Sequence, residues 1–161
     1  MLFSTKAEYG VRLMVELGRR AGDGSPDEAE PVALAAVAEA ELLPLSYLEH
    51  LVAKLRQAGL VTSTRGAHGG YRLARSASEI TMNEVVEALE GQITPMECFH
   101  LTPEGKVLCS HEADASHACA TKLLWTRVQG GVNKALTGTT LADLVEFAGP
   151  RETKESVGSA A

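Results

Sequence analysis

Residues 45–75 read LSYLEHLVAKLRQAGLVTSTRGAHGGYRLAR, and this stretch decides the fold. Its first half predicts a helix with one buried face, because apolar residues recur at the i, i+3, i+4 and i+7 positions, namely Leu48, Leu51, Val52 and Leu55. Gly59 ends that helix. Two short apolar segments, 60–61 and 71–73, then flank a glycine-rich stretch, which predicts a β-hairpin. The pattern is typical of a recognition helix followed by a wing.

The face of this helix opposite the apolar stripe is polar. Four of its side chains can reach hydrogen-bond partners across a groove: Tyr47, His50, Lys54 and Gln57. Ser46 and Glu49 have the spacing of a capping box, so a local role for the Glu49 carboxylate is the alternative to contact with a partner. For Tyr47 and His50 the alternative is that they are ordinary surface residues.

Two helices are predicted upstream of this stretch. Thr5 and Glu8 form a capping-box pattern, and an apolar four-residue repeat then predicts a helix from about 5 to 20. A loop rich in glycine, proline and acidic residues follows, and a short alanine-rich helix is expected at about 32–40.

Downstream, Thr81 and Glu84 form another capping-box pattern ahead of an apolar helical stripe. Residues 92–118 show neither helical nor strand periodicity, and a loop of this length in a compact protein is usually functional or disordered. A long amphipathic helix is predicted from about residue 118, because apolar residues recur every four positions at Leu124, Val128, Val132 and Leu136. Such a stripe needs a partner, so we interpret it as a dimerisation helix, followed by a short helix at about 140–147.

The charge of the chain is unevenly distributed. Its net charge is −6, but the excess of acidic residues lies entirely in residues 77–161. Within residues 42–75 the local balance is +4, because Glu49 is the only acid there against five basic residues, namely Lys54, Arg56, Arg65, Arg72 and Arg75. A basic stripe of this kind is expected where phosphates are bound, the alternative being a solvated charged face.

The apolar runs are far shorter than the roughly 20 residues that span a bilayer, and the N-terminal residues lack the pattern of a secretory signal. We therefore expect a cytoplasmic protein with no membrane partner. Three cysteines, an odd number, argue against a closed disulfide framework and leave metal binding or redox chemistry. No Cys/His/Asp arrangement accompanies a hydrolase motif, so we do not expect an enzyme.

The order of these elements over about residues 2–147 resembles the Rrf-type family of bacterial winged-helix transcription regulators, which includes IscR- and NsrR-like iron–sulfur cluster sensors. The motifs that carry the resemblance are LSYLE at 45–49, LRQAGLV at 55–61, RGAHGGY at 65–71 and CATKLLW at 119–125. It implies a mainly α fold with a small β-hairpin wing, in which a winged helix-turn-helix domain is joined to a long dimerisation helix. It also implies a homodimer that binds a double-stranded DNA operator.

We expect four regions along the chain. They are a winged helix-turn-helix DNA-binding domain at 1–91, a cysteine-containing cluster-binding loop at 92–118, a dimerisation helix with a short C-terminal helix at 119–148, and a flexible tail at 149–161.

For DNA contact, the resemblance implies that a group on the recognition helix lies at the groove, namely Ser46, Tyr47, Glu49 and His50. It also implies that Arg65 of the wing enters a minor groove or meets the backbone. Glutamate can accept a hydrogen bond from cytosine N4, and a narrow A·T minor groove attracts arginine. Lys54 and His68 complete the expected DNA-binding set.

In the family, three cysteines of this region ligate an iron–sulfur cluster, and Cys98, Cys109 and Cys119 fall in the matching positions. The resemblance therefore implies a [2Fe-2S] or [4Fe-4S] cofactor, for which thiolates are the standard ligands. The spacing here, C-x10-C-x9-C, is wider than in the familiar members. A zinc site and merely exposed thiols are the alternatives.

The fourth ligand differs between branches of the family. One branch uses a histidine three residues after the last cysteine, where this chain has Lys122, which cannot ligate while protonated. In the nitric-oxide-sensing branch an aspartate near the start of the first helix of the other subunit completes the site, and Glu8 occupies that position here. His111 and His117, each two residues from a cysteine, are the next candidates.

These inferences predict a homodimeric transcription regulator, a repressor, whose DNA affinity is controlled by an iron–sulfur cluster. Iron–sulfur cluster assembly genes or a nitric-oxide or redox response are the expected targets. Loss of the cluster would release the cysteine loop at the root of the dimer helix and shift a two-state equilibrium of the recognition helices. The alternative is a winged-helix regulator without a cluster that senses a metabolite, a partner protein or zinc.

Overall fold

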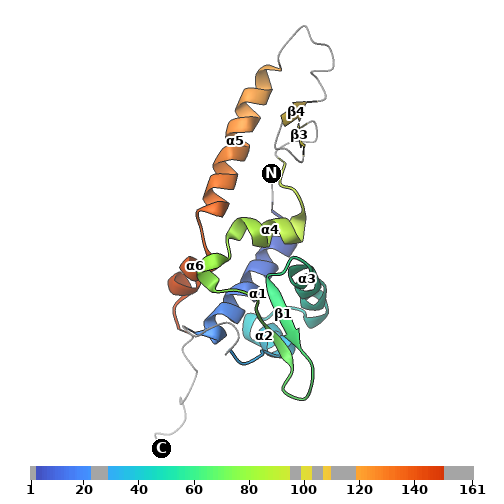
Figure 1. Cartoon of the computed structure of the whole chain (residues 1–161). Helices are drawn as coiled ribbons and strands as arrows, with labels where there is room; N and C mark the ends of the chain where they lie inside the picture. Colours follow the sequence, from blue (N-terminus) through green and yellow to red (C-terminus); the bar gives the residue numbers. More distant parts are fainter. Residues whose placement is uncertain (1–2, 23–28, 95–98, 103–106, 110–118, 151–161) are drawn as a thin grey trace, which may run out of the picture.

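The computed structural model describes residues 3–22, 29–94, 99–102, 107–109 and 119–150, which form a helical body with a hairpin at one end and a long helix projecting from the other (Figure 1). The helices are α1 (Thr5–Ala21), α2 (Leu34–Glu41), α3 (Leu45–Gln57), η1 (Ala77–Glu79), α4 (Met82–Glu90), α5 (Ala120–Thr137) and α6 (Leu141–Ala148). The strands are β1 (Val61–Thr64), β2 (Gly70–Leu73), β3 (Phe99–Leu101) and β4 (Val107–Cys109). The predicted fold class, mainly α with a hairpin wing, is confirmed.

The core lies around α1, which packs against α2, α3, α4, α6 and β2. Leu13 and Met14 of α1 are completely buried and share one apolar cluster with Leu89 of α4. Gly10 allows α1 and α4 to approach closely, because a β-carbon at this position would clash with the Leu89 side chain. The body that carries the recognition helix is therefore held by apolar packing around a single central helix.

The helix-turn-helix pair, α2 and α3, follows the sequence prediction to within two residues at α2. The predicted apolar stripe of α3 is buried, with at most 2% of each side chain exposed. The expected capping box between Ser46 and Glu49 is wrong, because α3 already begins at Leu45 after Pro44 and no side chain caps it. Ser46 therefore lies inside the first helical turn, where its hydroxyl cannot occupy the capping position.

The expected capping box between Thr5 and Glu8 is also wrong. Ser4 caps α1, and its Oγ accepts a hydrogen bond of 3.2 Å from the Lys6 N–H. The carboxylate of Glu90, at the end of α4, accepts hydrogen bonds from both the N–H and the hydroxyl of Ser4. The acid that completes this helix start therefore comes from α4, and the cap joins the two helices.

The wing is an antiparallel hairpin of β1 and β2, in which Val61 pairs with Leu73 and Thr64 with Gly70. Its root is fixed by Val32, just before α2, because Val32 and Tyr71 exchange two backbone hydrogen bonds of 2.8 Å. Val32 thus acts as a third, one-residue strand that ties the hairpin to the helix-turn-helix.

Residues 92–118 were expected to contain no strands, and the described part corrects this expectation. β3 and β4 form a second antiparallel hairpin, in which Phe99 pairs with Cys109. Strands of three residues are too short to produce a recognisable alternation of apolar and polar side chains, so the pattern gave no signal.

The long helix α5 runs without a break through Gly130 and Gly131 and projects beyond the body (Figure 1). Backbone hydrogen bonds from Met82 to Thr139 and from Leu141 to Ile80 hold the turn between α5 and α6 against the start of α4. α6 returns to pack on α1. Of the expected tail at 149–161, Gly149 and Pro150 are described, and residues 151–161 lie outside the described residues. None of the helices in the described ranges is long and apolar enough to cross a membrane.

Candidate nucleic-acid interface

The exposed face of α3 gathers most of the predicted groove residues. Ser46, Glu49 and His50 are all exposed, and their spacing puts them on the side of the helix opposite the buried stripe. The Glu49 carboxylate is not used in a helix cap, so the local alternative to base contact is removed. A hydroxyl, a carboxylate and an imidazole thus lie side by side, with both donors and acceptors available for base edges.

Tyr47 lies at the border between this face and the core. It is half-buried, and its ring meets that of Tyr9 edge-on, with 5.8 Å between the centroids and an interplanar angle of 89°. Edge-to-face pairs of this kind fix ring orientation. Tyr47 therefore anchors α3 to α1 through its ring.

Lys54 is exposed, but its ammonium points to α4. The Lys54 Nζ donates a hydrogen bond of 3.1 Å to the carbonyl oxygen of Leu89, in the last turn of α4. A cation is stabilised at this end of a helix by the unpaired carbonyls and the helix dipole. The side chain thus connects the recognition helix to the helix that leads into the cysteine-containing segment.

The tip of the wing carries Arg65 and His68, and both are exposed. Gly66 between them has φ +121°, a conformation that residues with a β-carbon rarely adopt. Along β1, the Arg56 Nη1 of α3 donates a hydrogen bond of 3.3 Å to the Ser63 Oγ. The wing therefore presents one cation and one imidazole at its tip, and a second cation lies where it meets α3.

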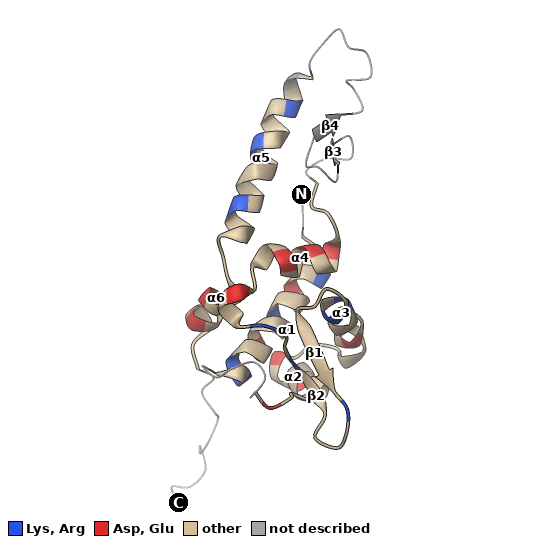
Figure 2. Ribbon diagram, viewed as in Figure 1, with Lys and Arg blue, Asp and Glu red and all other residues tan. Residues whose placement is uncertain are grey.

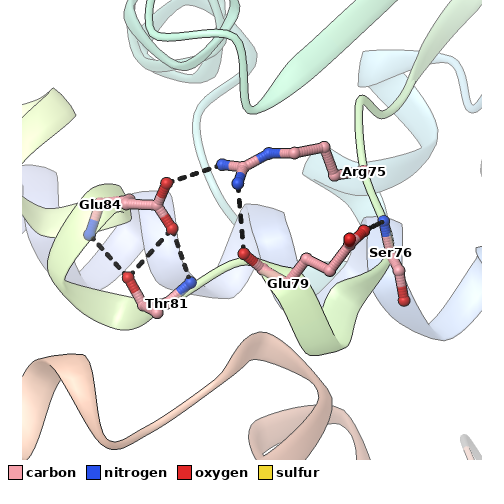
Figure 3. Close-up of polar contacts among 5 residues, drawn as sticks. All are labelled: Arg75, Ser76, Glu79, Thr81 and Glu84. Carbon is pink, nitrogen blue, oxygen red and sulfur yellow. Dashed lines mark hydrogen bonds and ion pairs between the residues drawn. The ribbon is translucent and has the colours of Figure 1, made fainter.

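Arg75, counted in the basic stripe, is engaged within the protein. Its guanidinium donates to the Glu84 carboxylate at 2.8 Å and to the Glu79 carbonyl at 3.2 Å, as Figure 3 shows. The same carboxylate accepts bonds from the Thr81 N–H and hydroxyl, which confirms the predicted capping box of α4. The Thr81 N–H, together with Arg75, lowers the pKa of Glu84 from its ordinary value. This ionic network fixes the start of α4 to the segment that leaves the wing.

Among the described residues after the wing, the acidic ones of α4 and α6 lie away from it (Figure 2). Figure 2 shows acidic residues on α4 and α6, whereas α5 carries only basic ones, namely Lys122, Arg127 and Lys134. The wing hairpin projects from the end of the body opposite α5 (Figure 1). The negative net charge is therefore compatible with a polyanionic partner at α3 and the wing.

Of the three predicted cluster ligands, only Cys119 has a described side chain. It stands at the N-cap of α5, partly exposed, with its sulfur 3.1 Å from the Thr121 Oγ1. Cys109 is described only in its backbone, as the last residue of β4, while Cys98, His111 and His117 lie outside the described residues. Within the ranges that the structure describes, no three His, Cys, Asp or Glu side chains gather into a metal site.

Glu8, the predicted fourth ligand, lies on the first turn of α1 with 64% of its side chain exposed, and its nearest basic partner is Arg12 at 4.0 Å. Arg12 itself donates to the Glu41 carboxylate at 3.0 Å. Glu8 lines a hollow of about 480 Å³ between α1, α4 and the foot of α5, together with Phe3, Val11, Val86 and Leu136. The carboxylate therefore stands at the edge of a partly apolar depression.

Two exposed residues of α3 were not singled out as contacts from the sequence: Leu45 and Ala53. Placing residues at 100° intervals around the helix axis would have found Ala53, which lies close to the direction opposite the buried stripe, whereas Leu45 lies at the border of the stripe, next to Val52.

Comparisons with known proteins agree with this geometry. Residues 3–147 match the Rrf2 family, described as iron-dependent transcriptional regulators. The chain is 38% identical to the HTH-type transcriptional regulator CymR of Bacillus subtilis, over 91% of each chain. It is 34% identical to the HTH-type transcriptional regulator IscR of Yersinia pseudotuberculosis, over 90% of this chain and 79% of that one.

Two solved structures show the same fold. CymR, the global cysteine regulator of B. subtilis, has a TM-score of 0.70 at 35% identity, with 91% of this chain and 98% of that chain covered. T. potens IscR has a TM-score of 0.68 at 34% identity, with 98% and 94% covered.

Proposed function

This chain belongs to the Rrf2 family of DNA-binding transcriptional regulators and is not an enzyme, and we propose that it is a cytoplasmic homodimeric repressor whose DNA affinity is controlled by an iron–sulfur cluster. Its targets would be iron–sulfur assembly genes or a nitric-oxide or redox response. The functional units of this proposal would be DNA binding in 1–91, the cysteine segment at 92–118, dimerisation in 119–148 and a tail at 149–161.

The DNA-reading residues of this proposal come from α3 and the wing. Ser46, Glu49 and His50 would contact base edges in the major groove, since the N-terminal part of the second helix of a helix-turn-helix enters that groove. Arg65 and His68 would meet the minor groove or the phosphates from the wing. Their exposure, on α3 and on the wing that packs against it through β1, supports this assignment. Tyr47 would contact DNA through its hydroxyl while its ring remains on Tyr9.

The homodimer is supported by the uncovered apolar surface of α5. Leu123 and Leu124 are 62% and 55% exposed near its free end, and the part-exposed Val128 and Val132 continue the stripe toward the body. Exposed apolar stripes of this length mark association surfaces. Packing of α5 against the partner's α5 would also bring the partner toward the hollow that Glu8 lines.

The cysteines suit a cluster in number and type, and the β3–β4 hairpin supports their approach. The Cα atoms of paired residues in an antiparallel hairpin lie about 4.5–5.5 Å apart. Cys109 pairs with Phe99, the residue that follows Cys98 in the chain, and Cys98 itself lies outside the described residues. Cys119 completes the thiol set, with Glu8 of the partner or one of His111 and His117 as the fourth ligand. The cluster would supply a centre that reacts with oxygen or nitric oxide or changes its redox state.

Helix α4 connects the cysteine segment to both DNA-reading elements. Lys54 of α3 holds the Leu89 carbonyl at its C-terminal end, directly before residues 92–118. Arg75, which follows the wing, holds Glu84 at its N-terminal end. A change of order in the cysteine segment would therefore reach the recognition helix and the wing through a single rigid helix.

We expect Lys54→Met to weaken this connection without removing a phosphate contact. The slope of log affinity against log salt should stay unchanged, because the ammonium is bonded to Leu89. The free energy of unfolding should fall by about 1 kcal/mol, and the change in DNA affinity on cluster loss should shrink. Arg65→Ala is the matched control and should reduce the slope by about 1 per subunit. An equal reduction for Lys54→Met would instead assign Lys54 to DNA.

The proposal is tested by anaerobic purification of the full chain, with a visible absorption spectrum and counts of iron and acid-labile sulfide. Coloured protein with matched iron and sulfide, whose operator affinity changes when the cluster is removed, is the expected result. Protein that stays colourless after reconstitution with iron and sulfide would overturn the proposal that the chain binds a cluster.

The second candidate is a cluster-free regulator that senses a metabolite, a partner protein or zinc. The similarity to CymR, a global cysteine regulator, favours it. Colourless protein that still binds operator would support this candidate. Metal analysis would then separate a zinc sensor, which contains zinc, from a sensor of a metabolite or a partner protein, which does not.

A further inference from the structure

Two exposed leucines lie at the entry to the recognition helix. In the described ranges, Leu42 is 89% exposed in the turn before α3, and Leu45, the first residue of α3, is 41% exposed. Pro44 between them is also exposed. The other large apolar side chains that are exposed in these ranges lie elsewhere: Phe3, Leu123, Leu124 and Phe147. We call Leu42, Pro44 and Leu45 the apolar turn.

The fold does not use the outer part of this turn. Leu43 supplies the buried side chain of the turn, with 7% exposed, and its N–H donates to the Ala38 carbonyl at 2.9 Å. Leu42 has φ 54° and ψ 44°, a left-handed conformation that bulky L-residues rarely adopt. Glycine or asparagine would fit that position better. The left-handed backbone of Leu42 ends α2, because its N–H bonds to the Ala38 and Glu39 carbonyls, but its exposed side chain takes no part in this cap.

The position of the apolar turn identifies its partner as DNA. Leu45 is adjacent to Ser46 and one helical turn from Glu49, on the part of a helix-turn-helix that enters the major groove. Arg56 of α3 and Arg65 of the wing are exposed, and Glu49 is the only acid of residues 42–75; of the two acids that precede the turn on α2, Glu39 is exposed and Glu41 is paired with Arg12. This charge favours a polyanion over an apolar protein surface. The thymine 5-methyl group is the apolar feature of the major groove.

We propose that Leu45, together with Leu42 of the same turn, reads thymine methyl groups in the major groove and so adds sequence preference to the polar contacts of α3. The inference deepens the DNA-binding function of the chain and is independent of the cluster. It assigns a preference for thymine at positions next to those read by Ser46 and Glu49.

The test uses operators selected by the full chain from a random double-stranded DNA library at fixed salt. Each thymine is then replaced singly by deoxyuridine, which removes only the methyl group. For the wild type we expect about a 4-fold loss of affinity at one or two positions per half-site, the equivalent of one buried methyl group. Leu45→Ala should weaken binding to the unmodified operator by a similar factor, and deoxyuridine at those positions should then cause no further loss.

Phe147→Ala, which truncates a 93% exposed side chain on α6, is the matched control and should retain the wild-type sensitivity to deoxyuridine. Unchanged binding of Leu45→Ala to non-operator DNA would show that the variant is folded. Leu42→Asn, which suits the left-handed backbone, should lower the same sensitivity without loss of stability. A wild type that is insensitive to every thymine replacement would overturn the proposal without any variant. Full sensitivity retained in both Leu45→Ala and Leu42→Asn would overturn it as well.

Discussion

Replacing Gly70 by alanine is expected to detach the wing from the helix-turn-helix while leaving the helices intact. A β-carbon at Gly70 would stand 2.5 Å from the Val32 carbonyl carbon and 2.9 Å from the Ala33 nitrogen. These are backbone atoms, so no side-chain rotation can relieve the clash. Val32 is fixed by its two hydrogen bonds to Tyr71, and it can move only by breaking them.

The expected cost of Gly70→Ala is about 2–4 kcal/mol in the free energy of unfolding, from two lost hydrogen bonds and the overpacking. Operator affinity should fall at least 10-fold, since Arg65 and His68 depend on the hairpin for their position. Urea unfolding and binding at fixed salt measure the two effects. Thr62→Ala, an exposed change in the same hairpin, should alter stability by less than about 0.5 kcal/mol. An unchanged urea midpoint in Gly70→Ala would contradict the role given to Val32.

The sequence was sufficient to predict the helical part of this fold because each helix repeats its signal several times. The α3 stripe, for instance, has four apolar residues in register, and all four are buried. The wing was predictable for a different reason, since its glycines mark a turn that few other residues can form.

The helix caps were harder to predict, because the carboxylate at the start of α1 comes from Glu90, far away in sequence. A local capping-box pattern cannot reveal such a partner. The same limit explains Lys54, whose helical position suggests a groove contact, although its ammonium bonds to α4. Arg75 was likewise counted as part of a basic stripe, but its charge is paired with Glu84.

The cysteine site was predictable in composition and not in geometry. Three thiols indicate metal or redox chemistry, whereas the β3–β4 pairing that supports the approach of Cys98 and Cys109 depends on strands of three residues. Short strands are stabilised by their partner strand rather than by their own sequence. Glu8 was predicted as a ligand of the partner's site, and this stays a prediction.

Cys119→Ser is expected to remove the cluster, and this is the largest single effect that the proposed function implies. The substitution replaces one thiolate ligand of the cluster by a hydroxyl, which binds iron poorly. Iron and sulfide per chain should therefore fall to less than about a tenth of the wild-type values. Operator affinity of the variant should equal that of wild-type protein stripped of iron. Iron analysis, the visible spectrum and DNA binding on anaerobically purified protein give these quantities.

Thr121→Ala is the control for this variant, because it removes the hydroxyl that lies 3.1 Å from the Cys119 sulfur and keeps the thiol. It should retain iron, sulfide and the response of DNA binding. If Cys119→Ser keeps a full complement of iron while both variants remain folded by circular dichroism, Cys119 is not a ligand. Its place at the start of α5 would then serve the helix alone, and control of DNA binding would have to reach α4 by a route that does not include the root of α5.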